Sequence, residues 1–384
     1  MDTSTICVHG CGKKYDTTGA VSVPIFASST FAHPGVGQST GFDYSRSQNP
    51  TKEHLEHTIT ALEGGTETLA FSTGMAAITA LMELFFPGDH IVASYDLYGG
   101  TFRLFSHISE KNGLKFSYAK SAEEIQAKIT QVTKAVIIET PTNPMMNVID
   151  IAAISQITQK KNILLIVDNT FLTPIFQKPL SLGADIVWHS GTKYLGGHND
   201  TLAGMLTVKD SALAERLRFI AKTTGGCLSP FDSFLIIRGL KTLAVRMERH
   251  NKNALAVAQW LKQQKKIQKV YYIGLQDHPD YEISCRQASG FGGMISFTVD
   301  SEQTAKSILE NVKIIKYAES LGGTESLITY PLLQTHADLP LNEREARGIN
   351  TLLLRLSVGL EALDDIIEDL KQACLAAESG QASG

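Results

Sequence analysis

Short apolar runs alternate with helical patterns along the middle of the chain, and this alternation constrains the fold more than any other feature. The apolar runs predict strands at residues 68–73, 90–94, 115–119, 135–139, 163–168, 184–188 and 204–208. Helical spacing of apolar residues predicts helices at residues 74–86, 101–110, 122–129 and 151–159. Repeated β–α units with continuously apolar strands predict an α/β fold, in which helices cover both faces of a mostly parallel sheet.

The segments on either side of this alternation have a different character. Residues 1–60 are rich in Gly, Ser, Thr and Pro, and are expected to form an N-terminal arm whose last part, from Asn49, begins a helix. Beyond the alternation, a long helix is expected at 241–263, strands at 270–273 and 294–299, and helices at 302–309 and 361–376. The tail, 379–384, is expected to be disordered. Because 384 residues are too many for one ordinary core, we expect a large domain at 61–240 and a smaller α+β domain at 241–384.

Composition excludes several classes of function. The net charge of -4 gives no reason to expect nucleic acid or an anionic membrane as a partner. No apolar run is long enough to span a bilayer, and the first residues lack the pattern of a secretory signal. Five scattered cysteines fit a reducing compartment, so we expect a cytoplasmic protein. Cys7, His9 and Cys11 have no second pair to complete a metal site, so no metal is expected.

The segment 189–198, His-Ser-Gly-Thr-Lys-Tyr-Leu-Gly-Gly-His, is the first candidate site, because it follows the buried run at 184–188. A desolvated lysine just past a strand end can form a Schiff base with an aldehyde cofactor, which makes Lys193 a candidate nucleophile. Ser190 and Thr192 could hydrogen-bond a phosphate beside it. The alternative is that Lys193 is a solvated loop lysine.

Other polar residues follow the remaining strands, where ligands bind in such sheets. Gly74 and Met75 open a helix whose free N–H groups can bind phosphate. Tyr98 could stack on a planar ring or belong to the core, and Asn143 sits in a rigid turn as a hydrogen-bond donor. Asp168 ends an apolar strand and needs a partner, either a protonated pyridine nitrogen or a helix cap or arginine. The order of these groups suits one pyridoxal 5′-phosphate.

Two further places contain candidate ligands for anions. Tyr44 and Arg46 lie two residues apart in an extended segment, so both point to one side and could hold a phosphate or form a surface salt bridge. Arg355 lies within an apolar strand at 352–358, and a buried arginine needs an anion. That anion could be an internal carboxylate or the carboxylate of a substrate. A glycine-ended turn at 318–323 contains Ser320.

With these residues identified, the chain resembles the Cys/Met-metabolism family of pyridoxal-phosphate enzymes, which perform trans-sulfuration. The resemblance runs from residues 19–25 to 355–361, and the segment 189–198 is its most specific part. It implies the aspartate-aminotransferase type of fold, known as fold type I. It also implies that Lys193 binds the cofactor covalently, that Asp168 pairs with the ring nitrogen, and that Tyr98 stacks on the ring and assists the leaving group. The phosphate would be held by Gly74, Met75, Ser190 and Thr192.

The resemblance has implications for assembly and for the substrate as well. Tyr44 and Arg46 would reach the phosphate of a neighbouring subunit, which implies a dimer with shared active sites, paired again into a homotetramer. Arg355, with Ser320 and Asn143 nearby, would hold the carboxylate of an amino-acid substrate.

Two positions help to choose among the members of the family. Methionine γ-lyases have a cysteine where this chain has Gly100. Glu319 is similar to the acidic residue of γ-lyases and γ-synthases, where it can meet the distal ammonium of cystathionine. We therefore expect γ-lyase activity, from cystathionine to cysteine, 2-oxobutanoate and ammonia, with β-lyase side activity. The alternative is a γ-synthase that joins an O-acylhomoserine to cysteine. A different class remains, a non-catalytic sugar- or nucleotide-binding α/β protein in which Lys193 and Asp168 are structural.

Overall fold

The large sheet lies at the centre of the first two thirds of the chain. The computed structural model describes residues 1–12, 15–335 and 341–381. Seven strands pair in the order β1-β7-β6-β5-β4-β2-β3. Only β7 runs against its neighbours, so the predicted, mostly parallel sheet is confirmed. The strands are β1 (Glu67–Phe71), β2 (His90–Ser94), β3 (Lys115–Ala119), β4 (Thr133–Glu139), β5 (Leu164–Asp168), β6 (Ile186–Ser190) and β7 (Gly204–Val208).

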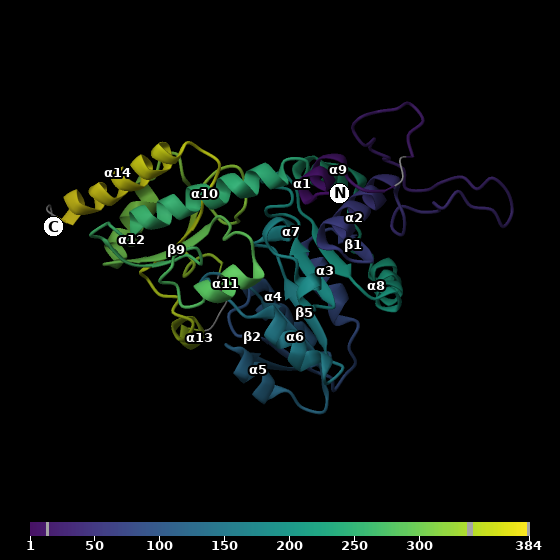
Figure 1. Cartoon of the computed structure of the whole chain (residues 1–384), viewed down its shortest axis with the longest axis horizontal. Helices are drawn as coiled ribbons and strands as arrows, with labels where there is room; N and C mark the ends of the chain where they lie inside the picture. The colour runs from purple at the N-terminus through teal and green to yellow at the C-terminus, as the bar shows by residue number, and fades with distance from the viewer. Residues whose placement is uncertain (13–14, 336–340, 382–384) are drawn as a thin grey trace.

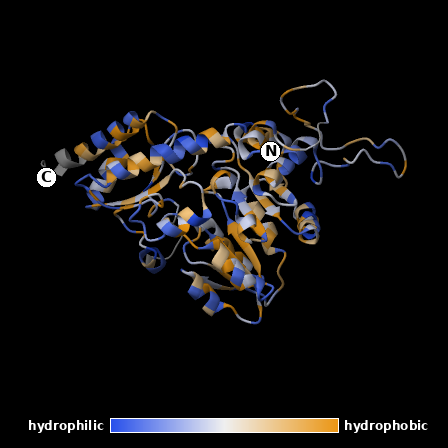
Figure 2. Cartoon of the chain, viewed as in Figure 1, coloured by the Kyte–Doolittle hydropathy of each residue, from blue (hydrophilic) through white to orange (hydrophobic). Residues whose placement is uncertain are grey.

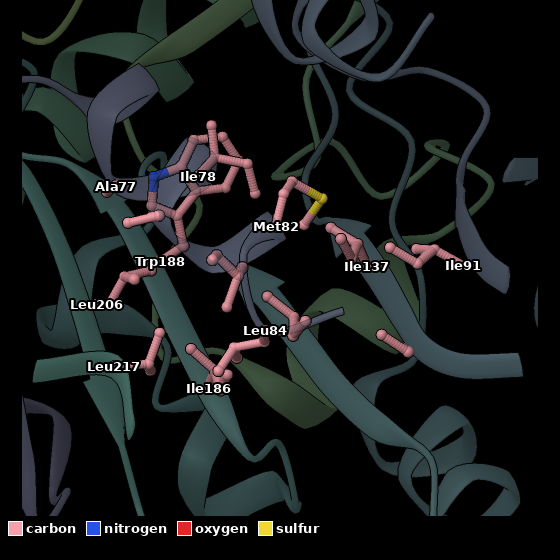
Figure 3. Close-up of a cluster of buried hydrophobic side chains, with 14 of the residues drawn as sticks. Ala77, Ile78, Met82, Leu84, Ile91, Ile137, Ile186, Trp188, Leu206 and Leu217 are labelled. Atoms are coloured by element: carbon pink, nitrogen blue, oxygen red, sulfur yellow. The ribbon is translucent and has the colours of Figure 1, made fainter. Parts of the chain in front are cut away.

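Helices cover both faces of this sheet because its strands are apolar on both sides. Ile137 packs into a cluster with α3 and α8, whereas its neighbour Ile138 packs on the other face with α5 and α6. Figure 3 shows part of the first cluster, where Trp188 lies beside Ile78. In Figure 2 the central strands are orange, as a sheet buried on both faces requires. The helices are α2 (Pro50–Glu63), α3 (Gly74–Met82), α4 (Gly99–Leu104), α5 (Ala122–Lys128), α6 (Ile151–Gln159), α7 (Thr173–Phe176), α8 (Ser211–Thr224) and α9 (Pro230–Leu240).

A second sheet of five strands, in the order β10-β11-β12-β9-β8, follows in the last third of the chain. Neighbouring strands in this sheet are antiparallel, except for the short parallel pair β10 and β11. The strands are β8 (Ile267–Tyr271), β9 (Met294–Val299), β10 (Lys316–Tyr317), β11 (Leu327–Thr329) and β12 (Leu353–Ser357). The helices are α10 (Leu243–Leu261), α11 (Tyr281–Gln287), α12 (Glu302–Asn311), α13 (Leu341–Ala346) and α14 (Leu363–Gln381).

Helix α10 joins the two halves of the molecule, as Figure 1 shows. Its first turns contribute Leu243 and Met247 to a core with α2 and α9, and its later turns contribute Val257 and Leu261 to the core of the second sheet. We propose that the boundary between a large and a small domain lies where this helix begins. No helix of the described residues is both long enough and apolar enough to cross a membrane.

The N-terminal segment projects from the rest of the chain. Residues 15–48 are mostly exposed and contain no helix, and Figure 1 shows them as loops that extend away from the body. The short helix α1 (Thr3–His9) was not expected in the arm. It forms because Asp2 caps its first turn and because Ile6 and Cys7 are buried in the core with α2.

Several predicted bounds were wrong. The helix predicted at 101–110 is divided into α4 and a π-helical turn, η1 (Phe105–Ser109), and a short 3-10 helix, η2 (Pro179–Leu182), was not expected. The strand predicted at 184–188 is shifted to β6, which makes Ser190 its last residue. Disorder from residue 379 is also wrong, because α14 continues to Gln381. An existing helix extends at little cost, even through weak helix formers. Residues 382–384 lie outside the described residues.

Candidate active site

A cavity of about 220 Å3 lies at the carboxyl ends of the central strands, where the large sheet meets the second half of the chain. The last residues of β4, β5 and β6, namely Glu139, Asp168 and Ser190, all line it. All the predicted site residues except Tyr44 and Arg46 line this cavity. They are Gly74, Met75, Tyr98, Asn143, Asp168, Ser190, Thr192, Lys193, Glu319, Ser320 and Arg355.

Lys193 lines the cavity from the turn after β6. Its Nζ donates a hydrogen bond of 2.9 Å to Ser320 Oγ. Burial, aided by the nearby positive charge of Arg355, lowers the pKa of the amine to about 8. A solvated loop lysine would have none of these features. An amine with this pKa is neutral often enough near pH 8 to act as a nucleophile.

Asp168 ends β5 and is buried beside Glu139, which ends the neighbouring strand in register with it. Thr170 donates to Asp168 Oδ1 through its backbone N–H at 2.9 Å and through its hydroxyl at 2.5 Å. Burial raises the pKa of Asp168 despite these two bonds. Within the described part of the chain, Oδ2 accepts no hydrogen bond. The carboxylate is therefore placed to receive a cationic N–H group, such as that of a protonated pyridine ring.

Arg355 is buried on β12 and makes three hydrogen bonds, none of them to a carboxylate. Its guanidinium donates to Asn143 Oδ1 at 2.9 Å, to the Ser320 carbonyl at 2.8 Å and to Thr329 Oγ1 at 3.1 Å. Burial lowers its pKa to about 10, so it remains charged near neutral pH. No acidic side chain among residues 1–12, 15–335 and 341–381 forms an ion pair with it. This arrangement favours an external carboxylate over an internal one as its anion.

The start of helix α3 also lines the cavity. Thr73 caps the helix by accepting a hydrogen bond from Ala76 N–H at 2.9 Å, so the N–H groups of Gly74 and Met75 remain available to a ligand. A Cβ added to Gly74 would lie 3.2 Å from the Ser190 side chain, so a larger residue would fit only if Ser190 moved by a few tenths of an ångström. The Thr192 hydroxyl bonds the backbone of Ala203 at the edge of β7. Because that hydroxyl proton is donated to the Ala203 carbonyl, this arrangement does not support the predicted phosphate contact of Thr192. The N–H groups of Gly74 and Met75, with the Ser190 hydroxyl beside them, remain as donors that suit a phosphate.

Tyr98 and Glu319 lie at the rim of the cavity. Tyr98 precedes α4, with a ring that is 40% exposed, and Glu319 is exposed beside Ser320. Tyr44 and Arg46 lie elsewhere, on the projecting arm, where the guanidinium carbon is 5.7 Å from the centre of the tyrosine ring. They do not contribute to the cavity of their own chain.

Sequence reasoning missed some residues that line the cavity, of which Glu139 and Thr170 matter most. Glu139 carried the same signal that identified Asp168, an acidic residue at the end of an apolar strand. Thr170 lies two residues after Asp168 and donates a hydrogen bond to its carboxylate, a local arrangement that is common after aspartate. The other unpredicted lining residues are Thr73, Pro141, Phe171, Trp188, Leu202, Leu321 and Thr335.

Comparison with known proteins gives a consistent result. The family model described as Cys/Met metabolism PLP-dependent enzyme matches residues 4–375. A cystathionine γ-lyase of Bacillus subtilis is 47% identical, over 97% of this chain and 99% of that protein. A cystathionine β-lyase of Lactococcus lactis is also 47% identical, over 96% and 98%. A cystathionine γ-synthase of Haemophilus influenzae is 48% identical, over 96% of each.

The solved structures include a cystathionine γ-lyase from Lactobacillus plantarum complexed with L-serine. It superposes with a TM-score of 0.96 at 43% identity, over 98% of this chain and 100% of that one. Fold type I, predicted from the resemblance, is thereby confirmed. The relatives carry different names for their reactions, so the comparisons establish the kind of chemistry more firmly than the substrate.

Proposed function

The chain belongs to the Cys/Met metabolism family of PLP-dependent enzymes, and from that membership we propose that it is a cystathionine γ-lyase, which converts cystathionine to cysteine, 2-oxobutanoate and ammonia. Its cofactor is pyridoxal 5′-phosphate. The observation that supports the proposal is the meeting of Lys193, Asp168, Arg355 and Glu319 in one cavity. A non-catalytic binding protein would have no need for a buried lysine of lowered pKa.

The residues of the cavity fit this cofactor. The free N–H groups at the start of α3, together with Ser190, would hold the phosphate. Asp168 Oδ2 would accept a hydrogen bond from the N–H of the protonated ring, and Lys193 would bind the aldehyde. When bound, the cofactor supplies an electron sink for the electrons left on the substrate's Cα after loss of its proton.

The side chains of the protein would orient the substrate and move its protons. Arg355 would bind the α-carboxylate, because its charge is not neutralised by its own partners, which are neutral acceptors. Loss of sulfur from Cγ requires removal of protons from Cα and then from Cβ. Lys193 is the base for both, since its lowered pKa lets it accept and return protons near neutral pH. Ser320 holds the amine between these transfers through its hydroxyl.

Selection of cystathionine would rest on two positions, Glu319 at the rim and Gly100, which is buried beside Tyr98. Glu319 is exposed beside the cavity and would meet the distal ammonium of cystathionine. At Gly100, an added Cβ would lie 2.6 Å from the Tyr98 ring and 3.1 Å from Met75 Sδ. A side chain there would displace the ring, so this site differs from that expected of a methionine γ-lyase. Glu319 equally suits a γ-synthase, and the relative of that name supports it as the second candidate.

The arm supports the proposal of a homo-oligomer with shared sites. Tyr44 is 50% exposed and lies beside Arg46 in the N-terminal segment, which Figure 1 shows extending away from the body. We propose that both residues reach the cofactor phosphate of a second subunit, within a dimer that pairs again into a tetramer. A cytoplasmic location is part of the same proposal.

One assay separates the candidate reactions. The enzyme, loaded with cofactor, is given cystathionine alone, and the keto acid is identified. A γ-lyase releases 2-oxobutanoate and a β-lyase releases pyruvate. A γ-synthase instead forms cystathionine from O-acetylhomoserine and cysteine. If cystathionine alone gives no keto acid while the second mixture reacts, the lyase proposal is wrong.

Glu319→Ala tests the recognition of the distal ammonium. We expect the KM for cystathionine to rise about fivefold, because an exposed ion pair contributes up to about 1 kcal/mol. The KM for homocysteine, which lacks that ammonium, should not change. Glu325→Ala is the matched control, because Glu325 bonds Asn199 and does not line the cavity. An equal rise for both substrates would contradict the pairing.

A further inference from the structure

One buried carboxylate holds the two turns that carry Tyr98 and Asn143. Glu139 is the last residue of β4 and is 5% exposed. Its Oε2 accepts the backbone N–H of Tyr98 at 2.9 Å, and its Oε1 accepts the backbone N–H of Asn143 at 3.0 Å. The strand itself is held at this point, because Glu139 N–H donates to Ser94 Oγ at 3.1 Å.

We infer that Glu139 is a positioning residue with two effects. It places the Tyr98 ring over the cofactor, and through Asn143 it places Arg355 for the substrate carboxylate. The inference rests on the proposed roles of Tyr98 and Arg355. Asp96, which lies in the Tyr98 turn, also accepts a hydrogen bond from the Thr142 hydroxyl of the other turn at 2.6 Å, whereas Glu139 accepts the backbone N–H groups of both turns.

A continuous series of hydrogen bonds leads from Glu139 to the reactive amine. Glu139 holds the backbone of Asn143, whose side-chain oxygen accepts from Arg355 at 2.9 Å. Arg355 donates to the Ser320 carbonyl at 2.8 Å, and Ser320 Oγ accepts from Lys193 Nζ at 2.9 Å. A shift of the Asn143 turn would therefore be felt by the substrate carboxylate site and by the amine.

The charge of Glu139 also acts on the cofactor site. It lies beside Asp168 in the neighbouring strand, and burial together with that second carboxylate raises its pKa well above the usual value. Two adjacent buried carboxylates repel one another unless a cation lies against them. A protonated ring nitrogen at Asp168 would relieve this repulsion, so Glu139 should strengthen the binding of the protonated ring.

The test is Glu139→Gln in the full chain, with two measurements. The first is the dissociation constant of pyridoxal phosphate, obtained by absorbance titration of cofactor-free protein. The second is the KM and kcat for cystathionine. We expect the dissociation constant and the KM each to rise about tenfold, because the amide accepts one N–H and turns a donor toward the other. If cystathionine is not the substrate, the KM is measured with O-acetylhomoserine, and the titration is unaffected by that outcome.

The matched control is Asp369→Asn. Asp369 is a buried carboxylate near the second sheet that accepts the N–H groups of Lys313, Ile314 and Ile315. Its replacement should lower the melting temperature and leave the dissociation constant and the KM unchanged. If Glu139→Gln behaves like this control, Glu139 only stabilises the fold and the inference is wrong.

Two more variants keep the test decisive. Glu139→Asp retains the charge but cannot reach both turns, so the KM should rise with a smaller change in cofactor affinity. If Glu139→Gln does not fold, Glu139→Asp replaces it in the test. A wild-type KM in Glu139→Asp would overturn the inference. In the double variant Glu139→Gln, Asn143→Ala, the KM should rise no further than in the more damaging single variant. Fully additive effects would contradict action through Asn143.

Discussion

Burial lowers the pKa of an amine, and in Lys193 this lower pKa makes the side chain a nucleophile and a base near neutral pH. The side chain is surrounded by protein, and its strongest charged neighbour is the guanidinium of Arg355. Both influences disfavour the ammonium form, whereas Glu319 opposes them more weakly. The apolar strand before Lys193 made its burial predictable from sequence. Its bond to Ser320, 127 residues away, was not predictable, because no local pattern encodes it.

The lowered pKa of Lys193 predicts how the cofactor-free protein reacts with pyridoxal phosphate. Only the neutral amine is nucleophilic, and its fraction rises with pH through the pKa. The rate constant for covalent binding, followed by stopped-flow absorbance, should therefore rise about tenfold per pH unit below pH 8 and level off above it. Free N-acetyl-lysine is the control, and its rate should continue to rise past pH 9. A protein rate that also rises past pH 9 would show an ordinary lysine.

At the scale of elements, the strand ends were predictable and the contacts across the sheet were not. The apolar runs located β4, β5 and β6 well enough to place polar residues at one edge, since parallel strands end together. Arg355 was identified as a buried cation from the residues alone. Its nearness to Asn143, 212 residues away, was expected only from the family resemblance, because the packing of the two sheets brings the two residues together. Glu139 had the same position at a strand end as Asp168, but its two backbone partners could not be foreseen, because sequence does not show which N–H groups a carboxylate will meet.

The contact between β7 and the start of α3 leads to a prediction at this scale. A Cβ added to Gly204 would lie 2.2 Å from the Thr73 carbonyl oxygen and 2.9 Å from Gly74 Cα. Because these are backbone atoms, Gly204→Ala should push α3 away from β7, lower the free energy of unfolding by about 1–3 kcal/mol and weaken cofactor binding. Gly226→Ala is the control, since its Cβ would meet the Ala76 methyl group at 3.3 Å. Denaturant unfolding and cofactor titration measure the two effects, and unchanged cofactor affinity would contradict the role of this contact.

At the scale of the whole molecule, the cavity needs both halves of the chain, and the arm belongs to neither half. Lys193 and Asp168 come from the first sheet, whereas Ser320 and Arg355 come from the region of the second. Tyr44 and Arg46, on the exposed arm, are not among the residues that line this cavity in the described part of their own chain. The residue types of Tyr44 and Arg46 suited either a phosphate contact or a surface salt bridge, and we propose that they contact the phosphate in another subunit.

Subunit complementation tests this shared site. Lys193→Ala removes the reactive amine from one chain, and Arg46→Ala removes the phosphate contact that the same chain would give its neighbour. Each variant alone should have little activity. When the two variants are co-expressed in equal amounts, about half of the dimers are hybrids by random pairing. Each hybrid has one intact site, so about a quarter of the wild-type sites are restored. Lys193→Ala with Asp168→Ala is the matched control, because both changes lie in the same cavity and each hybrid site stays damaged. If the first mixture is no more active than this control, the arm acts within its own subunit or not at all.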